Sequence, residues 1–171
     1  MGRAYLWMAG FAVAACATSA PQPEPAKVAS GAETFQTFQA KLDTRNEVPP
    51  PTLESGASPS GTASFTVQGP SVAYKLTASG LSGPPTAAHI HMGAPGAAGP
   101  VIVPLTVAAG SSPGTATGEG TFDASGVKGK KADGSAMTLE DVLAAMRSGG
   151  AYVNVHTANN KPGEVRGQIE K

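Results

Sequence analysis

Apolar residues recur at every second position along most of the chain from Thr34 onward, and clusters of glycine and proline separate the runs. In an extended strand, successive side chains point to opposite faces, so this alternation predicts strands with one apolar face. The runs are residues 38–42, 63–67, 72–78, 88–92, 101–105, 118–122, 151–157 and 164–169. We therefore expect an all-β fold, a Greek-key-like antiparallel β-sandwich of seven to eight short strands.

One segment follows a different period and predicts a single short helix. Its apolar residues at helical spacing are Leu139, Val142, Leu143 and Met146. Thr138 precedes the segment as a cap, with Asp141 three residues later, and Gly149 can end the helix. We expect the apolar stripe of this helix to pack against the sheet.

The chain is long enough for one domain and carries no excess charge. Of 171 residues, 40% are hydrophobic, and 12 Lys and Arg balance 12 Asp and Glu. We expect one folded domain over residues 34–171, large enough to bury a stable core. The densest group of cations lies in a predicted solvated turn and comprises Lys128, Lys130 and Lys131. Nucleic-acid binding needs clustered cations facing phosphates, so we expect no nucleic-acid partner.

The N-terminus resembles an export signal. Arg3 precedes an uncharged apolar stretch over residues 4–15, which is shorter than the ~20 residues of a membrane-spanning helix and suits a signal peptide. The stretch ends in Val13-Ala14-Ala15-Cys16, which resembles a lipobox. We therefore expect residues 1–15 to be removed and Cys16 to be lipidated, which anchors the protein to a membrane.

The alternative is an ordinary signal peptide that is cut after Ala20. Pro21 disfavours this cut, because a proline after the scissile bond lacks the amide hydrogen and restricts the preceding residue. Residues 16–33 are then a lipidated N-terminus and disordered tether. We expect an exported protein, anchored through Cys16 on the periplasmic or extracellular face of the cell envelope. Ala17 resembles the residue that directs lipoproteins to an outer membrane.

Four sequence stretches together resemble the CHRD domain, a module that is repeated in chordin and found singly in many bacterial exported proteins. They are FQAKLDTRNEVPP at 38–50, AAHIH at 87–91 with the glycine-rich segment 93–101 after it, YVNVHT at 152–157, and PGEVRGQI at 162–169. Met92 departs from the pattern, since such domains usually carry glycine there. The resemblance implies an extracytoplasmic β-sandwich without an established catalytic activity. We accordingly expect a non-enzymatic binding or structural module, with an envelope protein as a second partner besides the membrane.

All three histidines of the chain lie inside these motifs. In a strand, His89 and His91 share one face, away from the apolar set, and the same alternation turns His156 away from its apolar neighbours. The favoured interpretation is that the three imidazoles form hydrogen bonds to the glycine-rich loop 93–100. The alternative is a copper or zinc site, because both metals accept neutral imidazole nitrogens.

A metal-dependent redox enzyme is the least supported reading. A His-x-His strand in an exported sandwich resembles copper, zinc superoxide dismutase. That enzyme requires further histidines, a zinc ligand set and a disulfide, whereas this chain has three histidines and one cysteine. The sequence also shows no nucleophile elbow and no paired carboxylates, so we expect no catalytic residues.

Four further polar residues of the motifs are expected to have structural roles: Glu47, Asn154, Glu164 and Arg166. Because Glu164 and Arg166 are two apart in a predicted strand, they share a face and could pair with each other or with Arg45 and Glu47. Charged residues that flank a strand are usually solvated or paired across strands. Residues 46–51 include three prolines, so they should turn the chain away from the sheet.

Overall fold

The computed structural model describes Gly2 and residues 35–171, and the latter contain nine strands, one α-helix and two 3-10 turns. The strands are β1 (Thr37–Asp43), β2 (Ser60–Gln68), β3 (Ser71–Ser79), β4 (Pro85–Met92), β5 (Val101–Leu105), β6 (Ala108–Ala109), β7 (Ala116–Asp123), β8 (Ala151–Thr157) and β9 (Val165–Gln168). They form one sheet in the order β5-β4-β8-β9-β1-β2-β3-β7-β6, with every pair antiparallel. The all-β class predicted from the alternation is confirmed.

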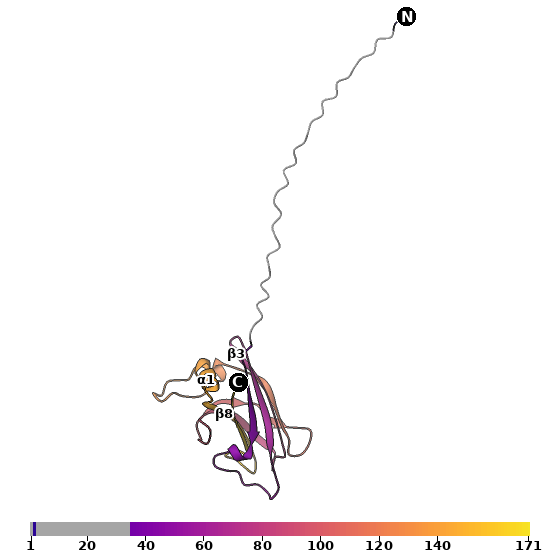
Figure 1. Cartoon of the computed structure of the whole chain (residues 1–171), viewed down its shortest axis with the longest axis vertical. Helices are drawn as coiled ribbons and strands as arrows, with labels where there is room; N and C mark the ends of the chain where they lie inside the picture. The colour runs from indigo at the N-terminus through magenta and orange to yellow at the C-terminus, as the bar shows by residue number, and fades with distance from the viewer. Residues whose placement is uncertain (1, 3–34) are drawn as a thin grey trace. The chain divides into compact units, whose positions relative to one another are not determined.

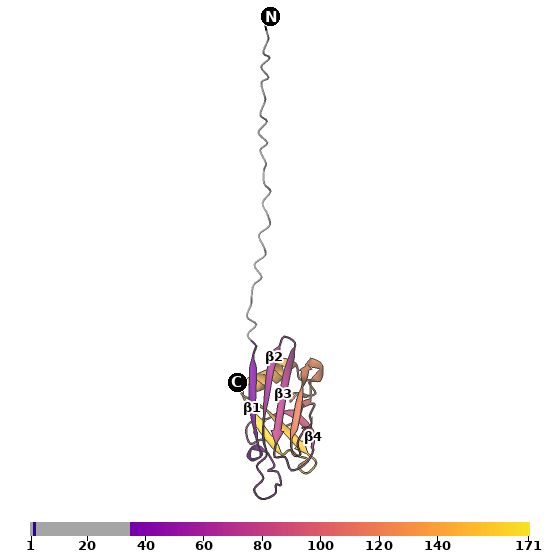
Figure 2. The same ribbon diagram turned by 90° about the vertical axis from the view of Figure 1, so that its right-hand side faces the viewer.

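The sheet curls on itself, which gives a sandwich-like arrangement. β1, β2 and β3 run side by side, and the C-terminal strands, yellow in Figure 2, cross obliquely behind them. Figure 1 shows β8 on the other side of the core from β3. The two halves of one twisted sheet therefore face each other across a shared core, which is how a sheet of this length avoids leaving an apolar face in water.

The predicted inner faces are the core. The alternating apolar residues of β1, β2 and β3 are buried, and Phe38, Phe65 and Val72 are fully enclosed. From the other half of the sheet, Ile90 and Val153 are also fully buried. Burying such side chains is the main favourable contribution to the stability of the fold.

Helix α1 (Leu139–Arg147) has the predicted signals at both ends. Thr138 and Asp141 form a reciprocal capping box, and Gly149 adopts the left-handed conformation (φ +68°) after the last turn. Val142 and Met146 are fully buried in the core cluster, so the helix packs against the sheet as expected. Its apolar stripe therefore has a packing role, and α1 lies beside the sheet in Figure 1.

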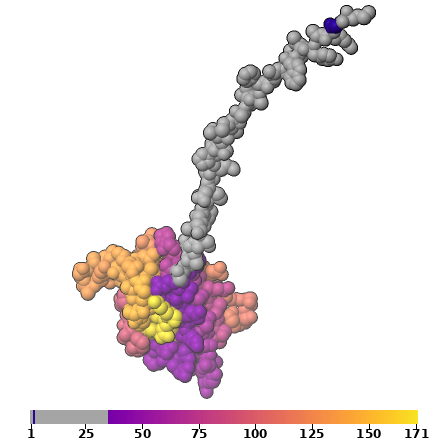
Figure 3. Space-filling view, turned by 45° about the horizontal axis from the view of Figure 1, so that its top comes forward, coloured from indigo at the N-terminus to yellow at the C-terminus, as the bar shows by residue number. Residues whose placement is uncertain are grey.

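The segment between β7 and α1 projects from the domain as the orange lobe of Figure 3. Lys128, Lys130 and Lys131 lie here and are exposed, which confirms the predicted solvated turn. Figure 3 also shows the yellow C-terminal residues beside the indigo strand β1. Among the residues that the structure describes, no helix is both long and apolar enough to cross a membrane. Apart from Gly2, the predicted signal peptide, Cys16 and the tether to residue 33 lie outside the described residues.

The two halves of the sheet differ on their outer faces. The outward side chains of β2 and β3 are mostly exposed to solvent. The outward side chains of β8 and β9 carry polar groups, and Tyr152, Asn154 and Arg166 are buried while His156 and Gln168 are partly buried. Loops therefore cover the outer face of β4, β8 and β9, and this covered polar face contains the three histidines, Asn154 and Arg166, with the buried Glu47 beside it.

Candidate metal centre and the buried polar face around it

Strands β4 and β8 bring the three histidines together. Their register sets His89 opposite Asn154 and His91 opposite Tyr152, and it places His156 on the same face, two residues further along β8. Because alternate residues of a strand share a face, all five side chains point away from the apolar core. The predicted orientation of the histidines is thus confirmed, and their clustering follows from the pairing of β4 with β8.

The imidazoles are close enough to share a ligand. The ring centroids of His89 and His156 are 4.8 Å apart, and His89 lies 5.6 Å from His91. One ring nitrogen from each histidine lies within 4.8 Å of the others. Nitrogens that share a tetrahedral zinc or copper ion are about 3.4 Å apart, given metal–nitrogen bonds of ~2.0–2.1 Å. Small side-chain rotations would close this gap.

The hydrogen bonds of the histidines define their tautomers. Nδ1 of His91 lies 2.8 Å from the carbonyl oxygen of Gly99, and Nδ1 of His156 lies 2.8 Å from that of Lys161. A carbonyl only accepts, so both Nδ1 atoms carry hydrogen and both Nε2 atoms of the neutral rings carry a lone pair. Nε2 of His156 lies 2.9 Å from Nδ1 of His89 and accepts a hydrogen bond from it. Nε2 of His91 is buried with no partner.

The surroundings keep the three rings neutral. Burial, and to a smaller extent the nearby His156 and His91, lower the pKa of His89 to about 4. Burial also lowers the pKa of His91 and of His156, although the carbonyl that each Nδ1 donates to acts in the opposite direction. Neutral imidazole is the form that binds metal ions. The three imidazoles are therefore neutral and able to bind a metal ion at neutral pH.

The predicted hydrogen bond between a histidine ring and the glycine-rich loop 93–100 is found for one histidine. We call a hydrogen bond of this kind, from a histidine to a loop carbonyl, a latch. His91 holds the glycine-rich loop through Gly99, as expected. His156 instead holds the loop that follows β8, through Lys161, and His89 bonds to His156 rather than to a loop. Each latch uses an Nδ1 atom and leaves an Nε2 lone pair facing the cluster. Backbone carbonyls that fix the far nitrogen of a histidine are typical of metal-ligating histidines, so the latch and metal interpretations are compatible.

A stack of three side chains supports His91. The ring of Tyr152 lies parallel to that of His91, with centroids 4.8 Å apart. The guanidinium carbon of Arg166 lies 3.4 Å from the centroid of the same tyrosine ring, which is a cation–π contact. Arg166 is 1% exposed and Tyr152 3% exposed, so the stack is enclosed.

The stack also binds the covering loop. Arg166 Nη2 donates to the carbonyl oxygens of Ala94 (3.0 Å) and Ala97 (2.9 Å). The amide of Gly99 donates to the Tyr152 hydroxyl at 3.2 Å. Neither of the pairings considered from the sequence, of Arg166 and Glu164 with each other or with Glu47 and Arg45, occurs among the ion pairs of residues 35–171. The guanidinium of Arg166 is directed to loop carbonyls instead. Charged residues that flank a strand are usually solvated or paired across strands, and Arg166 is neither, since it is buried and bonded to a loop.

Four buried side-chain atoms have no hydrogen-bond partner in the described part of the chain, and all four lie on this face. They are Glu47 Oε1, His91 Nε2, Asn154 Oδ1 and Arg166 Nη1. Asn154 lies close to Glu47 and His91, although no hydrogen bond joins it to either of these unpaired atoms. Burial raises the pKa of Glu47 to about 7, although Arg166 acts to lower it. Unpaired buried polar groups are rare in folded proteins, and a cluster of them indicates a site for a ligand or ordered water.

Glu164 forms a separate, fully paired network. Its carboxylate accepts hydrogen bonds from the Ser82 amide (2.6 Å), the Ser82 hydroxyl (2.7 Å), Thr157 (2.5 Å) and Asn160 (3.1 Å). Burial alone would raise the pKa of Glu164, but these donors outweigh it and lower the pKa. Glu164 thus ties two loops to the start of β9, which is consistent with the structural role predicted for it.

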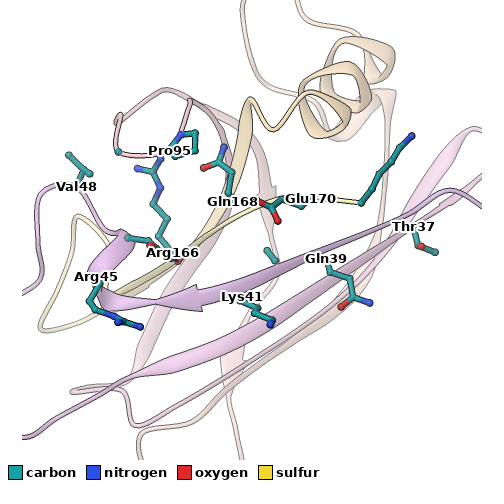
Figure 4. Close-up of a pocket in the computed structure, with 13 residues that line it drawn as sticks. Thr37, Gln39, Lys41, Arg45, Val48, Pro95, Arg166, Gln168 and Glu170 are labelled. Atoms are coloured by element: carbon teal, nitrogen blue, oxygen red, sulfur yellow. Dashed lines mark hydrogen bonds between the residues drawn. The ribbon is translucent and has the colours of Figure 1, made fainter.

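A groove of about 820 Å³ runs along the seam between β1 and β9. Figure 4 shows Lys41 and Arg45 on one side of it and Pro95 of the covering loop on the other. Arg166 lines the groove, and its side chain is directed toward Pro95. The histidines do not line the groove, so it is a surface distinct from the candidate metal centre.

Sequence reasoning did not find several residues that build the site. Ser82 and Asn160 lie in loops without a periodic pattern, and only the fold brings them to Glu164. Gly163 has a positive φ of +142°, and a Cβ there would collide with the Glu47 carboxylate. The Pro-Gly-Glu string of the last motif was the available signal, because a glycine in a turn allows the close approach of another group.

Comparison with known families gives one match. The model described as "CHRD domain" matches residues 38–169, which is most of the chain and includes all three histidines. No curated protein sequence and no solved structure matches the chain significantly.

Proposed function

Because this chain belongs to the CHRD domain family, we propose that it is a non-enzymatic binding module of the cell envelope, held at the membrane by a lipid on Cys16, and that it binds copper or zinc. The CHRD domain is not a known enzyme family, which supports a binding rather than a catalytic role. The residues that would hold the metal are His89, His91 and His156.

One observation carries the metal proposal: the buried Nε2 lone pair of His91 has no partner, and it belongs to a cluster of three neutral imidazoles. A hydrogen-bond latch explains the Nδ1 atoms of His91 and His156 but leaves this nitrogen unexplained. Leaving a buried acceptor unpaired costs about 1–3 kcal/mol, and a metal ion at this position would satisfy it.

The test separates the hydrogen-bonding role of His91 from its proposed metal-binding role. In His91→Asn, the side-chain amide can still donate to the Gly99 carbonyl, but the Nε2 position is lost. Isothermal titration of the purified protein with copper(II) or zinc(II) should show one site per chain, and binding should weaken by at least about a hundredfold in His91→Asn and in His156→Asn. Equal heats for the wild type and both variants, with thermal stability retained, would exclude the metal function.

The lipid tether is supported by the lipobox-like string before Cys16. A processed lipoprotein carries two or three acyl chains, which give stable attachment where one chain does not. Expression in a bacterial host with labelled fatty acid should label the wild type and leave Cys16→Ser unlabelled and released from membranes. Labelling of the Cys16→Ser chain would contradict the assignment of the anchor.

An envelope protein is the partner we propose besides the membrane, and the groove between β1 and β9 supports this proposal. It combines the cations Lys41 and Arg45 with an exposed apolar residue, Val48. A photo-crosslinker at position 41 should capture the same envelope protein in repeated experiments, whereas one at Lys75, on an exposed outer position of β3, should not. Identical products from the two positions would remove the groove as the contact surface.

A further inference from the structure

The candidate metal centre contains no anionic ligand. The group of potential metal donors consists of three imidazoles, and no carboxylate or thiol of residues 35–171 joins it. The one cysteine of the chain, Cys16, is the residue assigned to the lipid anchor. Any ion bound here keeps its full charge, because neutral nitrogens do not offset it.

The surroundings add positive charge on one side. The Arg166 guanidinium stacks on Tyr152, which stacks on His91, so a cation lies one aromatic ring away from a ligand. Glu47 is the buried carboxyl of the same face, but it stands outside the donor group and its charge is opposed by Arg166. The electrostatic environment therefore disfavours a highly charged ion.

Burial makes the charge of the ion decisive. The free energy of moving an ion out of water grows with the square of its charge, so a divalent ion loses about four times as much solvation as a monovalent ion of similar size. His91 is 8% exposed, and its Nε2 is out of contact with solvent. Imidazole softness alone does not select among copper and zinc ions, so charge is the discriminating term.

The number of donor atoms also favours a monovalent ion over a divalent one. Copper(II) favours a tetragonal arrangement with at least four ligands, and zinc favours four. This cluster supplies three nitrogens from the described residues, so copper(II) or zinc would need water as a fourth ligand, as zinc sites of three histidines do. Nε2 of His91 is out of contact with solvent, which favours an ion that needs only three ligands. Copper(I) is the monovalent transition-metal ion that binds imidazole in such an arrangement.

Resting on the metal function proposed above, we infer that this centre selects copper(I) over copper(II) and zinc(II). His91 and His156 bind through Nε2, with their Nδ1 atoms held by Gly99 and Lys161. His89 contributes the nitrogen that now donates to His156, after its proton moves to the other ring nitrogen, so the ring stays neutral. The selectivity comes from the neutral donor set and from Arg166.

The experiment compares three ions on one protein. The full chain carrying Cys16→Ser is used, so that the only thiol cannot bind copper. Copper(I) affinity is measured anaerobically by competition with bicinchoninate, and copper(II) and zinc(II) affinities by competition with chelators of known strength. We expect copper(I) to bind at least about a hundredfold more tightly than copper(II), which corresponds to a reduction potential raised by about 120 mV over the aqueous couple.

Two variants locate the cause. His91→Asn should abolish copper(I) binding while the fold is retained. Asn154→Asp places a carboxylate of nearly the same shape beside His91 and should lower the preference for copper(I) by at least about tenfold, because an anion favours the divalent ion. The preference measured on the chain with all three histidines decides the inference even if Asn154→Asp does not fold.

The outcomes distinguish this inference from the proposed function. If none of the three ions binds, the metal function and the preference for copper(I) both fail. If copper(II) or zinc(II) binds as tightly as copper(I), the metal function stands and the inference is overturned. An unchanged preference in a folded Asn154→Asp variant would show that charge does not set the selectivity, which also overturns the argument.

Discussion

The two halves of the sheet use the same alternating pattern for different purposes. In β2 and β3, one face is apolar and buried, and the other is polar and mostly exposed. In β8 and β9, the inner face is apolar as well, but the outer face is polar and mostly buried beneath loops. Both halves therefore look alike in the sequence, and they differ in what covers the outer face.

The difference shows where the specific chemistry of the domain lies. A polar side chain on β3 is hydrated, so it needs no defined partner. A polar side chain on β8 or β9 must be hydrogen-bonded or leave an unpaired group, because water is excluded. All four unpaired buried side-chain atoms among residues 35–171 lie on the covered face, and none lies on the exposed outer face of β2 and β3. Covering a polar face by loops thus creates a site that an exposed face cannot provide.

The largest expected effect comes from replacing one cationic residue on each half of the sheet with methionine. Arg166→Met removes the buried donor to Ala94 and Ala97 and leaves their carbonyls unpaired. Denaturant unfolding should show a loss of about 3–5 kcal/mol, as expected when one member of a buried polar network is removed. Lys75→Met on exposed β3 should change stability by less than about 0.5 kcal/mol. Similar changes in the two variants would mean that the covered face contributes no special stability.

A second test adds a methyl group to a glycine of positive φ on each half. In Gly163→Ala, the new Cβ would collide with the Glu47 carboxylate on the covered face. In Gly69→Ala, at the turn between β2 and β3, the Cβ would enter open space. We expect a loss of about 1 kcal/mol for Gly69→Ala from backbone strain and about 2–3 kcal/mol for Gly163→Ala. Equal thermal shifts would show that Glu47 moves aside freely.

The third test uses pH on the metal-free protein. Since burial depresses the pKa of His89 to about 4, the unfolded state binds the proton first, and stability is lost as pH falls from about 6.5 toward 4. The raised pKa of Glu47, about 7 through burial, has the opposite sign, because its contribution is present at low pH and lost as pH rises from 4.5 to 7.

All three histidine pKa values are depressed, so they should outweigh the single carboxyl. We expect a net loss of about 1–2 kcal/mol between pH 6.5 and 4, a figure reduced because His89 and His156 are partly solvated. Glu47→Gln should steepen this loss. Chemical denaturation at several pH values measures it, and a protein that gains stability over the same interval would contradict the assignment of neutral histidines.

The smallest expected difference compares two tyrosines. The Tyr152 hydroxyl accepts the amide of Gly99 (3.2 Å), and the Tyr74 hydroxyl accepts the amide of Thr106 (2.8 Å). Each change to phenylalanine should cost about 1 kcal/mol in unfolding experiments. Only Tyr152→Phe should also speed hydrogen exchange in the loop 93–100 and weaken metal binding, because only that hydroxyl holds the covering loop. A matching loss of metal affinity in Tyr74→Phe would remove the distinction.

Much of the fold could be predicted because its signals are local. The alternation of Phe38, Ala40 and Leu42 required only that successive side chains of a strand point to opposite faces, and their burial confirms it. The capping box of Thr138 and Asp141 also depends on neighbours in the sequence alone. The expected seven to eight strands became nine, because the two-residue strand β6 is too short to show a period.

The candidate site could be predicted only in part. His89 and His91 are two apart, so the sequence by itself determined that they share a face and turn away from the core. Whether His156 reaches them depended on the register of β4 with β8, which joins residues 67 positions apart. Local propensity carries no information on such a pairing, because it is set by the packing of the whole sheet.

The sequence by itself determined which side chains of each strand face the core, because strand geometry fixes that alternation wherever it occurs. Only the tertiary structure decided what lies over the opposite face. Loops close over Arg166 and His91 but leave Lys75 in water, although all three residues occupy outward positions of their strands. Burial depends on segments that are distant in the sequence and meet in the folded protein. Where these segments exclude water from a polar face, its unpaired atoms can be satisfied by a bound ligand.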